Sequence, residues 1–521
     1  MPSLSSQIYK NEFVNNFPGD ISGNSSSRQT PGVLYSKTLP TPVQNPTLLA
    51  WSDDLARELG LEKPTDQQDI NILGGNSVAP TMQPYAACYA GHQFGNWAGQ
   101  LGDGRAITLA ELETPAGQTW ELQLKGAGRT PYSRRADGRA VLRSSVREYL
   151  MSEAMHYLGV PTTRALSLVS TGDQVMRDMF YNGNPEFEPG AIVMRVAPSF
   201  LRFGNFEMLA ARQELENLQK LTAWTMQRYY PHIQGEGEDK ILAWFTDVLE
   251  RTASLMVEWM RVGFVHGVMN TDNMSILGLT IDYGPFSFLD EYDPRFTPNT
   301  TDLPGRRYAF GKQPSIGYWN LGCLASAIAP LLPDTTKLIA LLETYEDIYL
   351  GKYYTMLGNK IGLDEVRPED VALLTQLEKT LTIVKPDMAI FYQLLADLPA
   401  DLKEEADILH HFKDSFYQEP DTDRSTRFTD WIKTYGAWRK TNTGNPEEIK
   451  ERMRQTNPRF ILRNYLLHQA IEELTRGENT LFLKLQEAIK QPYSRNFAEF
   501  FNKKPDWASR KAGCSMLSCS S

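Results

Sequence analysis

The pattern of apolar and polar positions divides the chain into a strand-rich first part and a longer helical part. Residues 105–112 and 118–125 alternate apolar and polar side chains with a period of two, which predicts two strands. Beyond about residue 205, apolar residues recur at helical spacing, most clearly over 240–263 and again over 319–413. The pattern therefore predicts an α+β fold in which strands precede most of the helices.

Weaker patterns fill the remainder of the chain. Residues 192–196 predict another strand, and helical spacing runs over 144–158 before Gly159 and Pro161. The other predicted segments are an extended arm rich in Ser, Asn, Pro and Gly (1–45), a short amphipathic helix (45–60), a charged loop-like segment (414–459), and the last helices (460–476 and 480–490).

A small strand-rich part followed by a larger helical part is the order of protein-kinase-like bilobal folds. We therefore expect a strand-rich N-lobe and a larger helical C-lobe, with an extension at each end. The predicted parts are an N-terminal extension that packs on the core (1–80), a nucleotide-binding N-lobe (81–204), a helical C-lobe with the catalytic and metal-binding residues (205–415), and a C-terminal helical extension with a cysteine-containing tail (416–521).

Composition narrows the class of protein. The 521 residues carry a net charge of -10 and are 41% hydrophobic, which supplies a large core and excludes a disordered chain. Four cysteines are too few for a disulfide framework and fit a reducing compartment. The acidic balance opposes binding to nucleic acid or anionic membranes. The most apolar stretch, residues 318–332, is too short to span a bilayer, so we expect a cytoplasmic protein. We also expect a monomer.

A cluster of glycines between residues 91 and 105 is the first candidate site. Gly102 and Gly104 directly precede a predicted strand, where a loop that covers phosphate groups would lie. Glycines allow backbone N–H groups to approach phosphates closely. The alternative is a set of tight turns, because glycine patterns on their own are common.

Lys125 and Glu148 form a possible ion pair. Period two places Glu121, Gln123 and Lys125 on one face of their strand, where a lysine can contact phosphates and a helix carboxylate. Otherwise Lys125 is an exposed residue at a strand end. Glu148 would be the partner carboxylate, but Ser145 to Glu148 also reads as a capping box, in which Glu148 caps its own helix.

Basic residues are concentrated between residues 125 and 147, where the only acid is Asp137. The seven cations are Lys125, Arg129, Arg134, Arg135, Arg139, Arg143 and Arg147. Four of these arginines recur at intervals of four, which predicts either a solvated helical stripe or a surface that faces an anion. Arg195 and Arg202 add two cations nearby, and arginine suits bidentate contacts with phosphate.

The most specific segment is residues 263–284. Asn273 is followed nine residues later by Asp282, as in kinase-like folds that hold Mg²⁺ between nucleotide phosphates. A kinase places its catalytic Asp five residues before that Asn, but here the position is Val268. Asp272 is the nearby carboxylate that could replace this base from a shifted position. The segment therefore departs from ordinary phosphoryl transfer.

At this point the chain resembles the selenoprotein O family, pseudokinases that act as protein adenylyltransferases. The resemblance covers most of the chain and rests on residues 125–134 (Lys-Gly-Ala-Gly-Arg-Thr-Pro-Tyr-Ser-Arg), 267–276 (Gly-Val-Met-Asn-Thr-Asp-Asn-Met-Ser-Ile) and 282–286 (Asp-Tyr-Gly-Pro-Phe). Cys519 stands where some members carry selenocysteine. Those members have a cysteine three residues earlier, whereas this chain has Met516 there and its nearest cysteine is Cys514.

The resemblance implies roles for individual residues. ATP would bind in a flipped orientation, with Asp272 as general base, Glu148 paired with Lys125, and Mg²⁺ or Mn²⁺ held by Asn273 and Asp282. The residues implied to contact nucleotide are Gly102, Gly104, Arg105, Lys125, Asp137, Gly138, Arg195 and Arg202. The implied reaction is AMP transfer from ATP to Ser, Thr or Tyr hydroxyls of proteins. UMP transfer from UTP, a phosphotransferase with a displaced base, and a non-catalytic nucleotide-binding scaffold are the alternatives.

Overall fold

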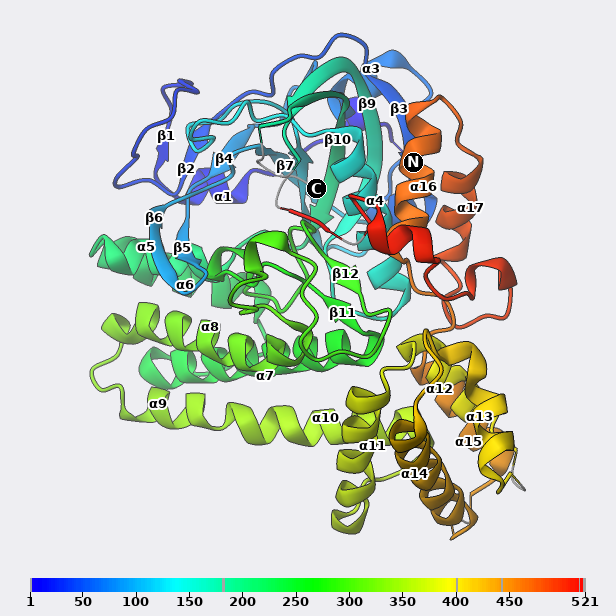
Figure 1. The fold of residues 1–521 in the computed structure, drawn as a ribbon. Helices are drawn as coiled ribbons and strands as arrows, with labels where there is room; N and C mark the ends of the chain where they lie inside the picture. Colours follow the sequence, from blue (N-terminus) through cyan, green and yellow to red (C-terminus); the bar gives the residue numbers. More distant parts are fainter. Residues whose placement is uncertain (1, 180–182, 400–401, 442–443, 515, 519–521) are drawn as a thin grey trace.

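An eight-stranded sheet forms the centre of the strand-rich part in the computed structural model, which describes residues 2–179, 183–399, 402–441, 444–514 and 516–518 (Figure 1). The strand order is β1-β2-β4-β7-β8-β10-β9-β3, and all neighbours are antiparallel except β1 and β2. The strands are β1 (Gly19–Asp20), β2 (Tyr35–Lys37), β3 (Thr47–Trp51), β4 (Tyr85–Ala87), β7 (Ala106–Glu113), β8 (Thr119–Lys125), β9 (Arg164–Arg177) and β10 (Glu186–Ala197).

The two strands predicted from alternation and the strand predicted over 192–196 are confirmed, and they lie side by side at the middle of this sheet. β8 pairs with β7 on one side and with β10 on the other, so that Gln123 lies opposite both Thr108 and Arg195. β10 begins earlier than the predicted 192–196. Its first residues are exposed and lack an apolar pattern, so the sequence does not reveal them as part of the strand. The register places Gln123, Lys125 and Arg195 close together.

Helices cover the two faces of the sheet. α2 (Asp53–Leu59) and α3 (Gln67–Leu73) pack with Ile192, Met194 and Val196 on one face. α4 (Leu142–Tyr157) packs with Ala191 and Val193 on the other face. The prediction of a helix over 45–60 is wrong for its first half, because β3 pairs with β9 there and the helix begins only after Ser52.

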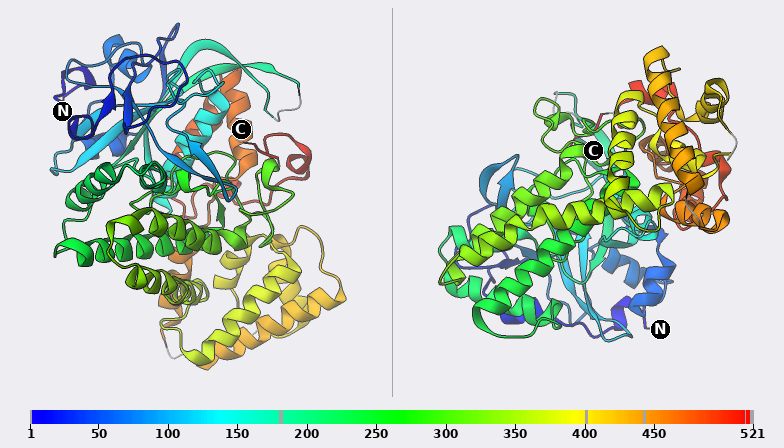
Figure 2. Two further views of the ribbon diagram at one scale, coloured as in Figure 1. Left: turned by 90° about the vertical axis from the view of Figure 1, so that its left-hand side faces the viewer. Right: turned by 90° about the horizontal axis from the view of Figure 1, so that it is seen from below.

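The helical part is built around α7 (Gly237–Val262), which packs against α8 (Gln313–Ile328) and α10 (Tyr345–Ile361) (Figures 1 and 2). The other helices between residues 203 and 412 are α5 (Phe203–Ala211), α6 (Leu215–Tyr229), α9 (Thr336–Glu343), α11 (Val371–Val384), α12 (Met388–Ala396) and α13 (Glu405–Phe412). The helices predicted over 240–263 and within 319–413 are therefore confirmed.

The prediction of a charged loop over 414–459 is wrong. This segment contains α14 (Thr422–Thr441) and α15 (Pro446–Thr456). Phe428, Trp431, Ile432 and Tyr435 of α14 are buried at helical spacing, so a narrow apolar stripe is sufficient despite the many charges around it.

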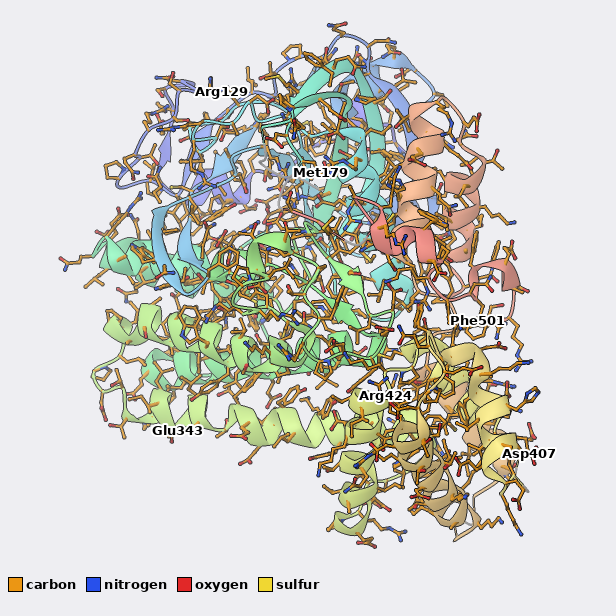
Figure 3. All side chains as sticks on the ribbon, viewed as in Figure 1. Arg129, Met179, Glu343, Asp407, Arg424 and Phe501 are labelled. Carbon is orange, nitrogen blue, oxygen red and sulfur yellow. The ribbon has the colours of Figure 1, made fainter. Side chains whose placement is uncertain are left out.

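The last helices return to the strand-rich part. α16 (Asn464–Thr475) packs on α4, and Gln486 of α17 (Thr480–Ala488) donates to the carbonyl of Trp51 at 3.2 Å. The tail then crosses to the loop that precedes α8, where Leu517 accepts a hydrogen bond from the backbone of Thr300 at 2.8 Å. The Ser518 hydroxyl donates to the carbonyl of Met179, which Figure 3 labels. Cys519 lies outside the described residues.

Within the described ranges, no helix combines the length and the apolar character that crossing a membrane requires. The domain boundaries, the cytoplasmic location and the monomeric state stay predictions. The chain as a whole is a mixed structure of one large sheet and many helices, as the α+β prediction requires.

Candidate nucleotide-binding and active site

A cavity of about 670 Å³ brings together most of the residues predicted to bind nucleotide. Its walls are the glycine-rich segment before β7, the end of β8, the hairpin of β9 and β10, and the loops that carry Asn273 and Asp282. The predicted residues that line it are Gly102, Gly104, Arg105, Lys125, Asp137, Gly138, Arg195, Asn273 and Asp282. Glu148, Arg202 and Asp272 are buried and do not line it. Glu148 pairs with Lys125 and Arg202 pairs with Asp282, and both partners line the cavity. The backbone oxygen of Asp272 accepts a hydrogen bond from Arg202.

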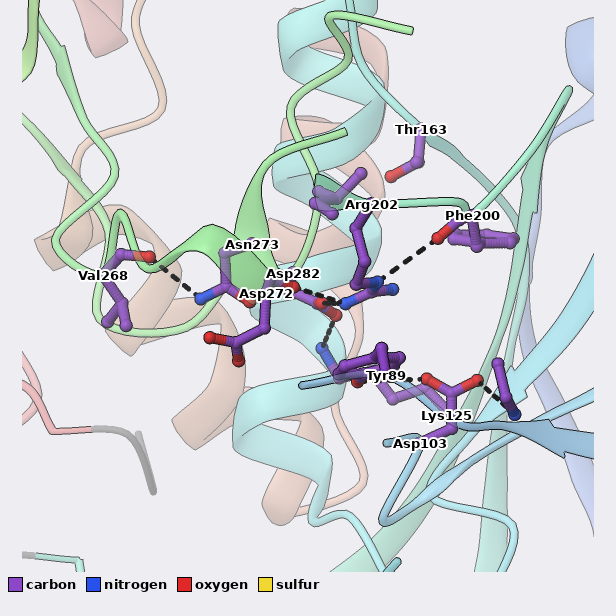
Figure 4. Close-up of polar contacts among 12 residues, drawn as sticks. Tyr89, Asp103, Lys125, Thr163, Phe200, Arg202, Val268, Asp272, Asn273 and Asp282 are labelled. Carbon is purple, nitrogen blue, oxygen red and sulfur yellow. Dashed lines mark hydrogen bonds and ion pairs between the residues drawn. The ribbon is translucent and has the colours of Figure 1, made fainter. Parts of the chain in front are cut away.

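Asp282 lies at the centre of a buried network of charges. Its Oδ1 is 2.5 Å from Arg195 Nη1 and 3.4 Å from Lys125 Nζ, and its Oδ2 is 2.6 Å from Arg202 Nη1 (Figure 4). Burial alone raises the pKa of Asp282, but the charges of Arg195, Arg202 and Lys125 outweigh it and hold the pKa well below its usual value. Asp282 is therefore ionised throughout the physiological range.

The ion pair between Lys125 and Glu148 is present. Lys125 Nζ is 2.6 Å from Glu148 Oε2, and Arg195 Nη1 is 3.1 Å from Glu148 Oε1. Because α4 begins at Leu142, Ser145 lies inside the helix and the capping-box alternative is wrong. Burial lowers the pKa of Lys125, and Glu148 opposes this shift. Glu148 thus orients two of the cations that face the cavity.

Arg202 connects two parts of the 263–284 segment, the turn at Asp272 and the carboxylate of Asp282. Its Nη1 donates to the backbone oxygen of Asp272 at 2.9 Å as well as to Asp282. Its guanidinium also lies over the Tyr89 ring, 4.5 Å from the centroid. With a side chain that is 1% exposed, Arg202 fixes the distance between Asp272 and Asp282 rather than forming the cavity wall.

The turn of residues 271–273 presents Asp272 and Asn273 next to each other (Figure 4). Asn273 Nδ2 donates to the carbonyl of Val268 at 2.9 Å, which leaves the amide oxygen as the acceptor. Asp272 lies under the hairpin of β5 (Ala90–Gln93) and β6 (Asn96–Gln100), and Gln93 Nε2 donates to its Oδ2 at 3.2 Å. Its Oδ1 is buried and has no hydrogen-bond partner in the described chain. Burial raises the pKa of Asp272 to about 6.

Asn273 and Asp282 fit a hard divalent cation. An amide oxygen and an ionised carboxylate are the oxygen donors that Mg²⁺ and Mn²⁺ prefer. Both side chains line the same cavity. The guanidinium groups that contact Asp282 are also the groups that phosphate oxygens would attract.

The glycines of the site serve close packing. A Cβ on Gly102 (φ +133°) would lie 2.6 Å from the Tyr132 ring, and one on Gly104 would lie 2.9 Å from the Tyr132 carbonyl. Between them, Asp103 is buried and accepts from Gln123 Nε2 at 3.2 Å. The tight-turn alternative thus describes these positions, and they shape the cavity wall without excluding a phosphate contact.

The basic run is not a helical stripe. Only Arg143 and Arg147 lie on α4, and neither faces the solvent: Arg143 pairs with Glu188 at 2.8 Å, and Arg147 is buried over the Phe286 ring at 4.2 Å. Arg134, Arg135 and Arg139 precede the helix and line the cavity. The interval of four therefore has no structural meaning, although the prediction of an anion-facing surface fits the arginines that precede the helix.

Several residues of the site were not singled out by the sequence. Arg177 lines the cavity from the end of β9 and pairs with Asp137 at 2.8 Å. Gln123 accepts from Arg195, and Gln93 covers Asp272. Period two already placed Gln123 on the face of Lys125, which was a usable signal. Arg177 and Gln93 carry no local signal, because their strands meet the site only through the fold.

Comparisons with known proteins agree with this geometry. Residues 25–490 match the family described as "Protein adenylyltransferase SelO". The chain is 62% identical to "Protein nucleotidyltransferase YdiU" of Cytophaga hutchinsonii over 521 residues, which is the full length of both chains. It is 50% identical to the protein of the same name from Azoarcus sp., with 99% of each chain covered. This chain therefore belongs to the SelO family of protein adenylyltransferases.

Proposed function

We propose that this protein transfers AMP from ATP to Ser, Thr or Tyr hydroxyls of acceptor proteins and releases pyrophosphate. The kinase-like bilobal arrangement, with residues 81–204 as N-lobe and 205–415 as C-lobe, would place the cavity between strands and helices. Family membership supports nucleotidyl transfer to proteins. The choice of AMP and of hydroxyl acceptors rests on the chemistry of the site.

The observation that carries the proposal is the replacement of one carboxylate by another. At the position of the kinase base stands Val268, which cannot accept a proton, while Asp272 offers a buried carboxylate with one unpartnered oxygen. A pKa of about 6 leaves Asp272 ionised at pH 7 yet basic enough to take a proton from a hydroxyl. The proposed base therefore lies further along the chain than the base of a kinase, and we propose that the α-phosphorus is attacked instead of the γ-phosphorus.

The distribution of cations supports a flipped nucleotide. Lys125, Arg195 and Arg202 meet at the deep end of the site around Asp282. The γ-phosphate carries the most negative charge and would lie at that deep end, which leaves the α-phosphate closer to Asp272. Arg105, Arg134 and Arg177 line the more open part of the cavity.

The transfer step follows from these positions. The acceptor hydroxyl replaces the Gln93 amide next to Asp272 and attacks the α-phosphorus. A bond forms between the acceptor oxygen and that phosphorus, the bond to the oxygen bridging the β-phosphorus breaks, and Asp272 takes the hydroxyl proton. Lys125 and Arg195 stabilise the negative charge that develops on the leaving pyrophosphate. Mg²⁺ or Mn²⁺ held by Asn273 and Asp282 would neutralise phosphate charge as a Lewis acid.

Labelled nucleotides test the proposal directly. ATP labelled at the α-phosphate is incubated with the protein, a protein acceptor and Mg²⁺ or Mn²⁺, and parallel samples contain γ-labelled ATP or α-labelled UTP. Incorporation of the α-label from ATP alone supports AMP transfer. Label from UTP would mean that UMP is the transferred group, and γ-label would mean a phosphotransferase with Asp272 as displaced base. Nucleotide binding without any incorporation favours the non-catalytic scaffold.

A further inference from the structure

A second cavity, of about 780 Å³, lies in the helical part, where α8, α10 and α11 and the segment before α8 contribute to its walls. Five tyrosines and three glutamates line it. Among the described residues that line it there is no Lys, Arg or His. One of these glutamates is the exposed Glu343 at the end of α9, which Figure 3 labels. The cavity is thus aromatic and acidic, and it has no internal cation.

The tyrosines form a ladder along one face of α10. Tyr345, Tyr349 and Tyr353 recur at intervals of four, with ring centroids 6.2 Å and 5.4 Å apart and planes within 18° of parallel. Tyr318 of α8 extends the ladder, 5.7 Å from Tyr345. A tyrosine ring face that is not covered by the neighbouring ring attracts a cation through its quadrupole, most strongly where water is excluded.

Glu378 provides a half-buried carboxylate in this wall. The Tyr353 hydroxyl donates to its Oε1, and no Lys, Arg or His in the described part of the chain lies within ion-pair distance. The hydroxyls of Tyr292 and Tyr349, whose side chains are 5% and 9% exposed, make no hydrogen bond to the described residues. Burial raises the pKa of Glu378, since no cation compensates its charge. The Glu378 carboxylate and these tyrosine oxygens are acceptors with free capacity in the cavity wall, which favours a ligand rich in N–H donors.

We propose that this cavity receives an arginine side chain of the acceptor protein. A guanidinium group has a permanent charge, five N–H donors for Glu378 and the tyrosine oxygens, and a flat face that stacks on aromatic rings. Its identification as part of the acceptor rests on the proposed function.

The path from the cavity to the active site supports this assignment. Pro294 and Phe310, in the segment before α8, line the cavity. Tyr308 of the same segment donates to Asn270 Oδ1 at 2.6 Å, directly before the turn that carries Asp272. An acceptor anchored by its arginine would therefore lie along a segment that leads to the proposed base.

The first experiment measures peptide binding without nucleotide, so it does not depend on the transfer reaction. A serine peptide that contains arginine is titrated against the full-length protein by calorimetry. Two otherwise identical peptides, the lysine twin and the citrulline twin, carry lysine or citrulline in place of the arginine and are titrated in the same way. We expect the arginine peptide to bind about 10-fold more tightly than the citrulline twin, and Glu378→Gln to remove that difference. The matched control is Asp347→Asn, which removes one charge from the exposed face of α10 outside the cavity. If the lysine peptide bound more tightly than the arginine peptide, lysine would be the anchoring residue and the arginine assignment would be overturned.

The second experiment measures transfer to the same peptides. Glu378→Gln is expected to raise the KM for the arginine peptide about 10-fold and to leave kcat and the Kd of ATP unchanged. Unchanged Kd for ATP also shows that the variant is folded. Equal binding of all three peptides, or an effect of Glu378→Gln on the citrulline twin, would overturn the docking proposal. Arginine-specific binding without α-label transfer would instead overturn the proposed function and leave the cavity as a binding site.

Discussion

The nucleotide-binding cavity and the aromatic cavity have similar volumes but opposite charge. The first, of about 670 Å³, is lined by seven basic and four acidic side chains, whereas the second, of about 780 Å³, is lined by three glutamates and no base among the described residues. In the first, each buried carboxylate near the centre has a cation or several donors. In the second, Glu378 has one tyrosine hydroxyl. One cavity is electrostatically compensated before a ligand arrives, and the other is not.

The difference shows how the chain separates two kinds of ligand. A net charge of -10 would repel a triphosphate everywhere, so the phosphate site needs its own group of cations. The carboxylates of Glu148 and Asp282 hold those cations together without a ligand. A cationic side chain, in contrast, is attracted by the whole protein and needs only a shaped acidic pocket. The following predictions test each side of this comparison, beginning with the largest effect.

Replacing Asp282 by Ala should have the largest effect, because it removes the carboxylate at the centre of the basic cavity. Lys125, Arg195 and Arg202 would be left buried around an absent charge, which costs about 3–5 kcal/mol of folding stability. The same change removes a ligand for Mg²⁺ or Mn²⁺. We expect α-label transfer to fall at least about 10³-fold, measured together with the melting temperature.

A second variant separates the two effects. Asp282→Asn preserves the shape of the side chain and still lacks the charge, so it should lose transfer while melting closer to the unmodified protein. Glu188→Ala removes an ion pair of Arg143 away from the cavity and should leave transfer unaffected. Full activity of Asp282→Asn would rule out the metal-binding role of Asp282.

Asp272→Asn should lower kcat about 10²–10⁴-fold and leave the affinity for ATP unchanged, because only the base is removed. The raised pKa of Asp272, about 6, fixes the pH dependence. Below pH 6 the carboxylate is protonated and cannot accept a proton, so kcat should rise about tenfold per pH unit up to pH 6 and level off above it. A kcat that is independent of pH between 5 and 7 would contradict the assignment of the base.

The sequence located the main residues of the basic cavity but not their connections. Period two placed Lys125 and Gln123 on one face, and the fixed interval between Asn273 and Asp282 was readable without a structure. The choice between a helix cap and an ion pair for Glu148 needed the start of α4 at Leu142. Arg135 and Arg139 share the interval of four with Arg143 and Arg147 but precede this start, which is why the basic run resembled a helical stripe.

The acidic cavity left almost no trace in the sequence. The interval of four between Tyr345, Tyr349 and Tyr353 indicates that they share one helix face, but not that this face borders a cavity. Glu378 belongs to α11, and only the packing of α10 against α11 brings it to that face. The wrong prediction over 414–459 has a different cause, because the aromatic residues at helical spacing in α14 form only a narrow stripe among many charges. Long-range packing creates the acidic cavity, whereas a local but weak pattern marks α14.

Arg177→Ala should weaken ATP binding only moderately, since Arg177 lies at the wider part of the basic cavity and pairs with the partly exposed Asp137. We expect the KM for ATP to rise about two- to fivefold at low salt, in line with the energies of exposed ion pairs. The difference should shrink at high salt, because solvent screens this part of the cavity. Titrations at two salt concentrations, with kcat as the control, measure it. An equal effect at both salt concentrations would mean that the contact between Arg177 and ATP is shielded from solvent.

Tyr349→Phe should have the smallest effect, and it acts on the acidic cavity alone. The variant removes a hydroxyl that has no partner in the described chain but preserves the ring in the tyrosine ladder. If that hydroxyl accepts an N–H of the arginine, the KM for the arginine peptide should rise about two- to threefold, the lower range for one hydrogen bond. Tyr354→Phe removes a hydroxyl from the same helix outside the cavity and is the matched control. A change in the KM for ATP in either variant would mean that the two cavities are coupled, and it would contradict their assignment to two separate ligands.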